Sequence, residues 1–254
     1  MKKLSDIVVS GVTVHPPRVL LYGPPGVGKT HFGAGADNPI FIQTEEGADV
    51  VGPPRFPLAK TFADVKDAVE QLRSTEHDYS TVVIDSLDWT ESLIWNEVCK
   101  AEKIENIEKL GYGKGYIYAL SFWKELLESL NLLRDERKMA VLLIAHTHVK
   151  QFNDPGQLPY DRYEIKLHKH AAALCMENSD VVAFATYRMR VQEIEGNFGK
   201  KVTRAVGEGE RIMCTQMRPA YVAKSRYPMD AEMDLSWVDL SKAISEGMKN
   251  GSSK

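Results

Sequence analysis

Short runs of apolar, mostly β-branched residues alternate along this sequence with longer stretches in which apolar residues recur at helical spacing. The runs predict strands at residues 18–22, 40–43, 81–85 and 140–145. Each run is nearly continuous, which is typical of strands buried on both faces of a sheet. Helical spacing appears between them, at residues 61–74, 87–104 and 116–134. This alternation predicts an α/β fold with a mainly parallel sheet flanked by helices.

The pattern changes in the carboxyl-terminal half. Residues 150–169 are polar, basic and broken by Pro and Gly, and we expect a long functional or disordered loop there. Strand-like runs follow at residues 181–191, 211–216 and 220–224, with a turn expected at residues 195–197, which indicates an antiparallel extension of the sheet. A helix is expected at 237–248. We expect one domain over 1–254, with a core of about 18–234, a short amino-terminal segment and a flexible tail.

Composition narrows the class of protein without choosing a function. The 254 residues carry a formal net charge of -3, so any contact with nucleic acid has to come from local basic patches. The three cysteines form no CxxC pair, which fits a reducing compartment. No apolar run reaches the roughly 20 residues that span a bilayer. We therefore expect a cytoplasmic protein with no membrane partner.

One motif carries specific chemistry. The sequence GPPGVGKT follows the first predicted strand and precedes a predicted helix, and it fits the phosphate-loop pattern G-x-x-x-x-G-K-[ST]. Its glycines let backbone N–H groups surround phosphates at a helix amino terminus, where the helix dipole favours anions. The predicted nucleotide-binding residues are Gly23, Pro24, Pro25, Gly26, Val27, Gly28, Lys29 and Thr30.

A phosphate loop also needs a carboxylate for Mg²⁺, and Asp85 ends the strand TVVID in the Walker B arrangement. We expect Thr30 and Asp85 to hold Mg²⁺, and Lys29 to reach the β- and γ-phosphates of ATP. The alternative role for Asp85 is a helix N-cap. These residues are suited to the phosphates of ATP and GTP alike.

Because Ser86 follows Asp85, the sequence lacks the Glu that ordinary AAA+ motors carry at that position. Instead, a Glu pair follows the second predicted strand, in Phe41-Ile42-Gln43-Thr44-Glu45 and then Glu46. This segment resembles the "FIDAE" pattern of the RecA-like ATPases, in which the catalytic Glu follows this strand. The resemblance implies that Glu45 orients the attacking water, with Glu46 as the fallback. Without it, a solvated loop carboxylate is an equal alternative.

The resemblance extends to two further places. His146 ends the strand VLLIAH, at the place where RecA-like proteins carry a Gln that senses the γ-phosphate. The resemblance therefore implies that His146 senses the γ-phosphate, and a structural histidine is the alternative. Lys224 and Arg226 are similar to the family's K-x-K or K-x-R pair, which reaches a neighbouring subunit's γ-phosphate. Exposed edge-strand cations are the alternative for that pair.

RecA-like recombinases bind DNA with two mobile loops, and basic and aromatic residues occur at both corresponding places. The first is the Gly-rich segment 109–116, which we expect to be an exposed, mobile loop; the second lies within residues 150–170. Ordinary connections are the alternative. The predicted DNA-binding residues are Tyr112, Lys114, Tyr116, Lys150, Arg162, Lys166 and Lys169.

Taken together, the residues resemble a RecA-like P-loop core without appendages, similar to phage ATP-binding proteins of single-strand annealing and recombination. The resemblance implies an Mg²⁺-dependent ATPase that assembles on single-stranded DNA as a filament or ring, with a single-strand binding protein as a further candidate partner. The alternatives are an AAA+ like loader or remodelling ATPase, and a P-loop kinase of a small molecule or nucleotide.

Overall fold

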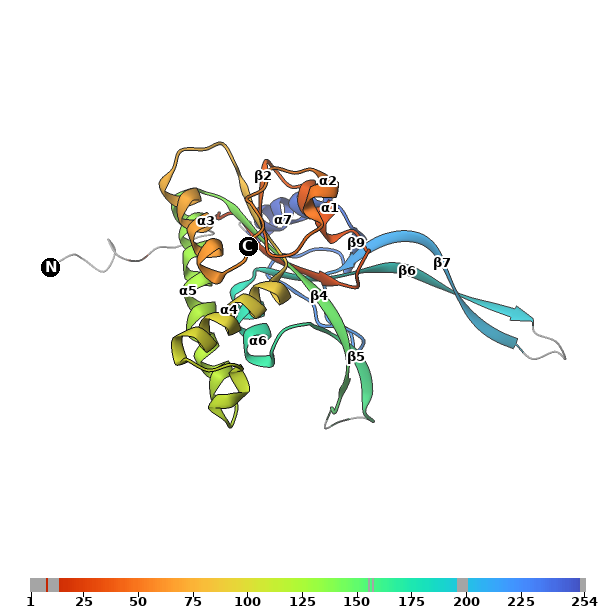
Figure 1. The fold of residues 1–254 in the computed structure, drawn as a ribbon. Helices are drawn as coiled ribbons and strands as arrows, with labels where there is room; N and C mark the ends of the chain where they lie inside the picture. The colour runs from red at the N-terminus through yellow and green to blue at the C-terminus, as the bar shows by residue number, and fades with distance from the viewer. Residues whose placement is uncertain (1–7, 9–13, 155, 157, 196–200, 252–254) are drawn as a thin grey trace.

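The computed structural model describes residues 8, 14–154, 156, 158–195 and 201–251 (Figure 1). Side chains at 189–195, 201–208, 250 and 251 are outside this description. The turn expected at residues 195–197 therefore lies largely outside the described residues, as do most of the amino-terminal segment and residues 252–254. Among the helices described, none is both long and apolar enough to cross a membrane.

A mostly parallel sheet forms the centre of the protein, as predicted. Its order is β2-β3-β4-β1-β6-β7-β9, so β4 lies between the phosphate-loop strand β1 and the Asp85 strand β3. The parallel strands are β1 (Arg18–Gly23), β2 (Pro39–Gln43), β3 (Thr81–Asp85), β4 (Ala140–Phe152) and β6 (Val181–Glu195).

The predicted antiparallel extension is also present. It consists of β7 (Lys201–Cys214), β8 (Lys224–Ser225) and β9 (Glu232–Asp234), and β6 and β7 form the long hairpin that projects from the body in Figure 1. Two bounds differ from prediction. The expected strand at 211–216 is the end of β7, and of the expected strand at 220–224 only Lys224 belongs to a strand.

Helices cover both faces of the sheet. On one face lie α3 (Phe62–Ser74), α4 (Leu87–Glu102), α5 (Lys114–Glu136) and α6 (Lys169–Asn178), with the 3₁₀ helix η2 (Ile107–Leu110) beside them. On the other lie α1 (Lys29–Ala34) and α7 (Trp237–Gly251). Successive strand residues alternate between these layers: Leu20 and Tyr22 pack under the first, and Val19 and Leu21 under the second. The two-sided burial explains the nearly unbroken apolar runs.

The strand register brings the carboxyl ends of the parallel strands to one edge. Gly23 lies opposite His146, and Gln43 opposite Asp85. Ligands of open α/β sheets bind at this edge. A short helix, α2 (Ala48–Val51), follows β2 there.

The loop expected at residues 150–169 is wrong. Strand β4 continues to Phe152 and pairs antiparallel with β5 (Tyr160–Ile165), so the segment is largely a hairpin. Its polar composition reflects exposure: Lys150 and Lys166 are exposed, whereas Ile165 is buried. Strand pairing here depends on contacts between β4 and β5, which the polarity of either strand alone does not reveal.

The prediction of a loop at 109–116 is also wrong at both ends, since residues 109 and 110 end η2. Gly111, Tyr112 and Gly113 form a turn with positive φ angles, but α5 begins at Lys114. Gly115 is buried in the first turn of that helix. A Cβ placed on Gly115 would lie 2.5 Å from the carbonyl oxygen of Ile107 in η2. The glycine therefore permits a close helix approach rather than mobility.

We predict that Gly115→Ala destabilises the protein by about 1–3 kcal/mol, because the added methyl group forces α5 away from η2. The urea unfolding midpoint measures this effect. Lys114→Ala, one residue earlier and exposed, is the matched control and leaves the free energy of unfolding within about 0.5 kcal/mol of wild type. Equal midpoints for Gly115→Ala and wild type would contradict the close-packing interpretation.

Candidate active site

The phosphate loop connects β1 to α1 and takes the shape that its glycines allow. Gly26 has a φ of 76° and Gly28 a φ of 106°, both in the region that favours glycine. Gly28 is the N-cap of α1 and also leaves room for a guanidinium, because its Cβ position lies 2.9 Å from Nη1 of Arg211. The predicted loop is thus a turn at a helix amino terminus.

Lys29 is buried inside this loop. Its Nζ donates hydrogen bonds to the carbonyl oxygens of Gly23, at 3.1 Å, and Pro24, at 3.0 Å. Burial lowers the pKa of Lys29, while Asp85 and Glu45 oppose that effect. The loop carbonyls and nearby carboxylates therefore keep the ammonium inside the turn, next to the place where phosphates bind in such loops.

Thr30 and Asp85 are in direct contact, as their predicted shared role requires. The Thr30 hydroxyl donates to Oδ2 of Asp85 at 2.8 Å. Burial raises the pKa of Asp85, and the Thr30 hydrogen bond and Lys29 work against that rise. A hydroxyl and a carboxylate oxygen are hard oxygen donors suited to Mg²⁺, so these residues fit the ion that a P-loop site uses.

Glu45 lies at the same edge because Thr44 ties β2 to the end of β3. The Thr44 N–H donates to the Asp85 carbonyl at 2.8 Å, and its hydroxyl donates to the Ser86 carbonyl at 2.7 Å. A cavity of about 350 Å³ is lined by the phosphate loop, Asp85, Glu45 and Glu46. Glu45 is partly buried whereas Glu46 is exposed, and burial raises the pKa of Glu45.

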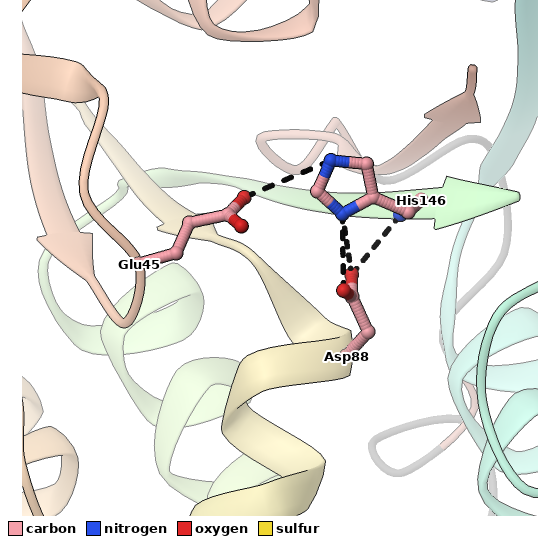
Figure 2. A group of neighbouring side chains, drawn as sticks. All are labelled: Glu45, Asp88 and His146. Carbon is pink, nitrogen blue, oxygen red and sulfur yellow. Dashed lines mark hydrogen bonds and ion pairs between the residues drawn. The ribbon is translucent and has the colours of Figure 1, made fainter. Parts of the chain in front are cut away.

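His146 stands between two carboxylates (Figure 2). Its Nδ1 lies 3.0 Å from Oδ2 of Asp88, and its backbone N–H donates to the same carboxylate at 3.1 Å. Its Nε2 lies 3.9 Å from Oε1 of Glu45. Burial alone would raise the pKa of Asp88, but hydrogen bonds from His146 outweigh it and hold that pKa below its usual value. The donor atoms of the three residues lie within 4.8 Å of one another.

Asp88 was not among the residues predicted from the sequence. The available signal was its spacing: it comes three residues after Asp85, in the first turn of α4, so both carboxylates lie at the edge where β3 ends. The aspartate fixes the imidazole from below in Figure 2, and the imidazole in turn faces Glu45. His146 is therefore connected to the candidate water-orienting carboxylate.

Two residues of the long hairpin also reach the phosphate loop, and the sequence carried no signal for either. Tyr187 donates a hydrogen bond from its hydroxyl to the Gly26 carbonyl at 3.1 Å. Arg211, paired with Tyr187 across β6 and β7, lines the 350 Å³ cavity beside Gly28. The hairpin thus adds a cation to the loop from a strand more than 180 residues away in the chain.

Lys224 and Arg226 lie away from this cavity. Lys224 pairs with Val182, near the start of β6, and neither residue lines the cavity that the described residues form at the phosphate loop. Arg226 contacts Asp180 at 3.0 Å, and Asp180 also accepts from Arg18 at 2.8 Å. Their role toward another subunit's nucleotide stays a prediction.

The predicted DNA-binding residues fall into groups. Tyr116 and Lys166 line one cavity of about 480 Å³; Lys150, Arg162 and Lys169 line a neighbouring one of about 220 Å³. Tyr112 and Lys114 are exposed beyond them. The charge of Arg162 is already matched, since its guanidinium lies 2.6 Å from Glu164 and 3.7 Å above the Phe152 ring.

Comparison with known proteins identifies the family. A family model described as an AAA domain matches residues 15–227, and the chain belongs to this family of P-loop ATPases. The SPbeta prophage-derived uncharacterized protein YorG of Bacillus subtilis (strain 168) is 23% identical over 172 residues, which cover 65% of this chain and 49% of that protein. The chain thus spans about half the length of the curated relative it matches. The crystal structure of the RadB recombinase aligns with 75% of this chain and 87% of its own, at 15% identity and a TM-score of 0.38.

We predict that Arg211→Ala weakens nucleotide binding about tenfold, and more for ATP than for ADP, because the guanidinium lies at the mouth of the phosphate loop. Titration calorimetry with both nucleotides measures the difference. Arg188→Ala is the matched control: Arg188 lies on the same hairpin but pairs with Glu210 at 2.5 Å, outside that cavity. If Arg211→Ala and Arg188→Ala bound nucleotide with equal affinity, Arg211 would have no part in nucleotide binding.

Proposed function

We propose that the protein is an Mg²⁺-dependent ATPase that binds single-stranded DNA as an oligomer and promotes annealing or recombination. One observation supports the hydrolytic part above all: Lys29, the Thr30–Asp85 pair and Glu45 converge on a single cavity from three strand ends. P-loop hydrolysis needs a cation that binds the phosphates, a pair of oxygen ligands for magnesium and a separate carboxylate.

Each residue has a definite task in this proposal. Lys29 exchanges its loop carbonyl partners for phosphate oxygens, and Thr30 with Asp85 holds the magnesium ion, which neutralises phosphate charge when bound. Glu45 accepts a hydrogen bond from water and orients it toward the terminal phosphate. Asp88 holds the His146 imidazole, so that Nε2 stays on the Glu45 side and positions that carboxylate.

The DNA part rests on where the basic and aromatic residues gather. Segments from two separate parts of the sequence, the start of α5 and the β5–α6 region, contribute Tyr116 and Lys166 to one cavity beside the active site. Cations together with aromatic rings suit a single strand, because phosphates and base faces are bound at once. The prophage origin in the name of the YorG relative fits this proposal.

The proposed oligomer places Lys224 and Arg226 at a neighbour's nucleotide. Within their own chain they lie beside Asp180, away from the phosphate loop. Lys224 and Arg226 would therefore bind the phosphate of an adjoining copy, as an arginine finger does.

A second candidate is an AAA-type ATPase that loads or remodels a partner protein, which the family match favours. Such a protein would hydrolyse ATP in response to its partner rather than to DNA. The two candidates share the nucleotide site and differ in the macromolecule that stimulates it.

We predict that Glu45→Gln lowers ATP turnover by about 100-fold or more while leaving ATP affinity within about threefold, because the amide cannot serve as the base that orients water. Steady-state phosphate release and nucleotide titration measure the two quantities. Glu46→Gln, exposed and adjacent, is the matched control and retains turnover. The reverse result, with loss only in Glu46→Gln, would transfer the role to Glu46.

We also expect single-stranded DNA to raise ATP turnover and to increase the mass of the complex in the presence of ATP. Lys224→Ala should reduce turnover about tenfold or more in the assembled state without abolishing nucleotide binding, because it removes a cation from the neighbouring site. Lys124→Ala, an exposed lysine on α5, is the control. If single-stranded DNA changed neither the ATP turnover nor the mass of the complex, the AAA-type remodelling function would be favoured.

A further inference from the structure

A cavity of about 480 Å³ lies next to the active site and shares Asp88 with it. Its walls come from α4, from the first turn of α5 and from the connection between β5 and α6. This volume is in the range of sites that take small organic groups. The residues that line it most distinctively are Trp89, Trp95, Tyr116, His168, Glu91 and Lys166.

Aromatic rings form most of one wall. Trp95 meets Tyr116 edge to face at 5.4 Å, and Tyr116 stacks on His168 at 4.3 Å with ring planes 9° apart. Burial and the neighbouring His170 and Lys169 lower the pKa of His168, which favours a neutral ring. Trp89 follows Asp88 in the first turn of α4 and is 52% exposed, which is unusual for an indole.

Polar groups complete the cavity at its floor and rim. Glu91 is only 5% exposed and accepts a hydrogen bond from the His168 backbone N–H at 2.9 Å. Burial raises the pKa of Glu91 to about 7. Lys166, which is exposed, and His148, which is half-buried, also line the cavity. Flat rings, a buried carboxyl group and an exposed ammonium match a planar heterocycle that carries a phosphate.

We propose that this cavity takes one unstacked nucleobase of a single DNA strand, with Lys166 contacting the phosphate beside that base. The inference rests on the proposed function and deepens it, since it gives the strand a specific pocket rather than two loops. Stacking on the exposed Trp89 indole holds the base, and Glu91 meets its polar edge. Because every base has a planar face, this contact is tolerant of sequence.

The location also links the base to hydrolysis. Asp88 lines the cavity with one side and holds His146 with its carboxylate, and His146 faces Glu45. A base inside the cavity is therefore two side chains away from the water-orienting carboxylate. Filling of the cavity changes the surroundings of Asp88, which provides a route from the strand to ATP turnover.

The test combines tryptophan fluorescence with strand binding. Trp237 is buried elsewhere, whereas Trp123 is buried against Glu91 behind the cavity. The part of the quenching that Trp89→Ala removes therefore reports the cavity. With a non-hydrolysable ATP analogue present, we expect oligothymidylate to quench this fluorescence, and an abasic strand of equal length to bind more weakly without quenching. Trp89→Ala should weaken oligothymidylate binding about tenfold and leave the abasic strand unaffected. Circular dichroism verifies that the variant is folded.

Tyr118→Ala is the matched control, because Tyr118 is 50% exposed, close to the 52% of Trp89, and does not line the cavity. It should retain most of the affinity and all of the quenching. Oligothymidylate binding without quenching, with Trp89→Ala equal to wild type, would overturn the base pocket while leaving the proposed function intact. Failure of both strands to bind in any nucleotide state would overturn the proposed function itself, and the pocket with it.

Discussion

The site depends on a balance of buried charge at the carboxyl edge of the sheet. Lys29 is the buried cation, and Asp85, Glu45 and Asp88 surround it at graded depths. Each of these charges would be costly to bury alone, and together they offset one another. The compensation is incomplete, since burial still raises the pKa of Asp85 and Glu45. The edge is therefore prepared for two further species, a polyanion and a cation, that complete the balance when they bind.

The proposed function does not use a glutamate beside the Walker B aspartate. Ser86 occupies that position and is buried, with its backbone bound to Thr44. This pair of hydrogen bonds joins β2 to β3 and carries Glu45 to the phosphate edge. Thr44 thus places the carboxylate of Glu45, which follows β2, beside the end of β3. Under the proposed function, the difference from ordinary AAA+ motors lies in which strand supplies the carboxylate, whereas the phosphate loop is shared.

Much of the fold and part of the site were predictable because their causes are local. Buried parallel strands require continuous apolar runs, and the phosphate loop requires glycines at fixed spacing, so both appear directly in the sequence. The hairpin of β4 and β5 was missed because its polar strands gain stability from pairing, which no short window displays. Arg211 was missed for a similar reason: its place at Gly28 depends on the register of β6 and β7. Asp88 lay between these cases, since its spacing from Asp85 was visible but its partner His146 was distant in the chain.

The hydrogen bond from Tyr187 to Gly26 has a mechanical meaning. The ladder between β6 and β7 runs from Phe184 to Glu195 with one irregularity, after Tyr187, so the hairpin is a ribbon fastened at its root to the phosphate loop. Bending of that ribbon pulls on the Gly26 carbonyl and on the guanidinium over Gly28. The position of the projecting arm is thereby coupled mechanically to the shape of the phosphate loop.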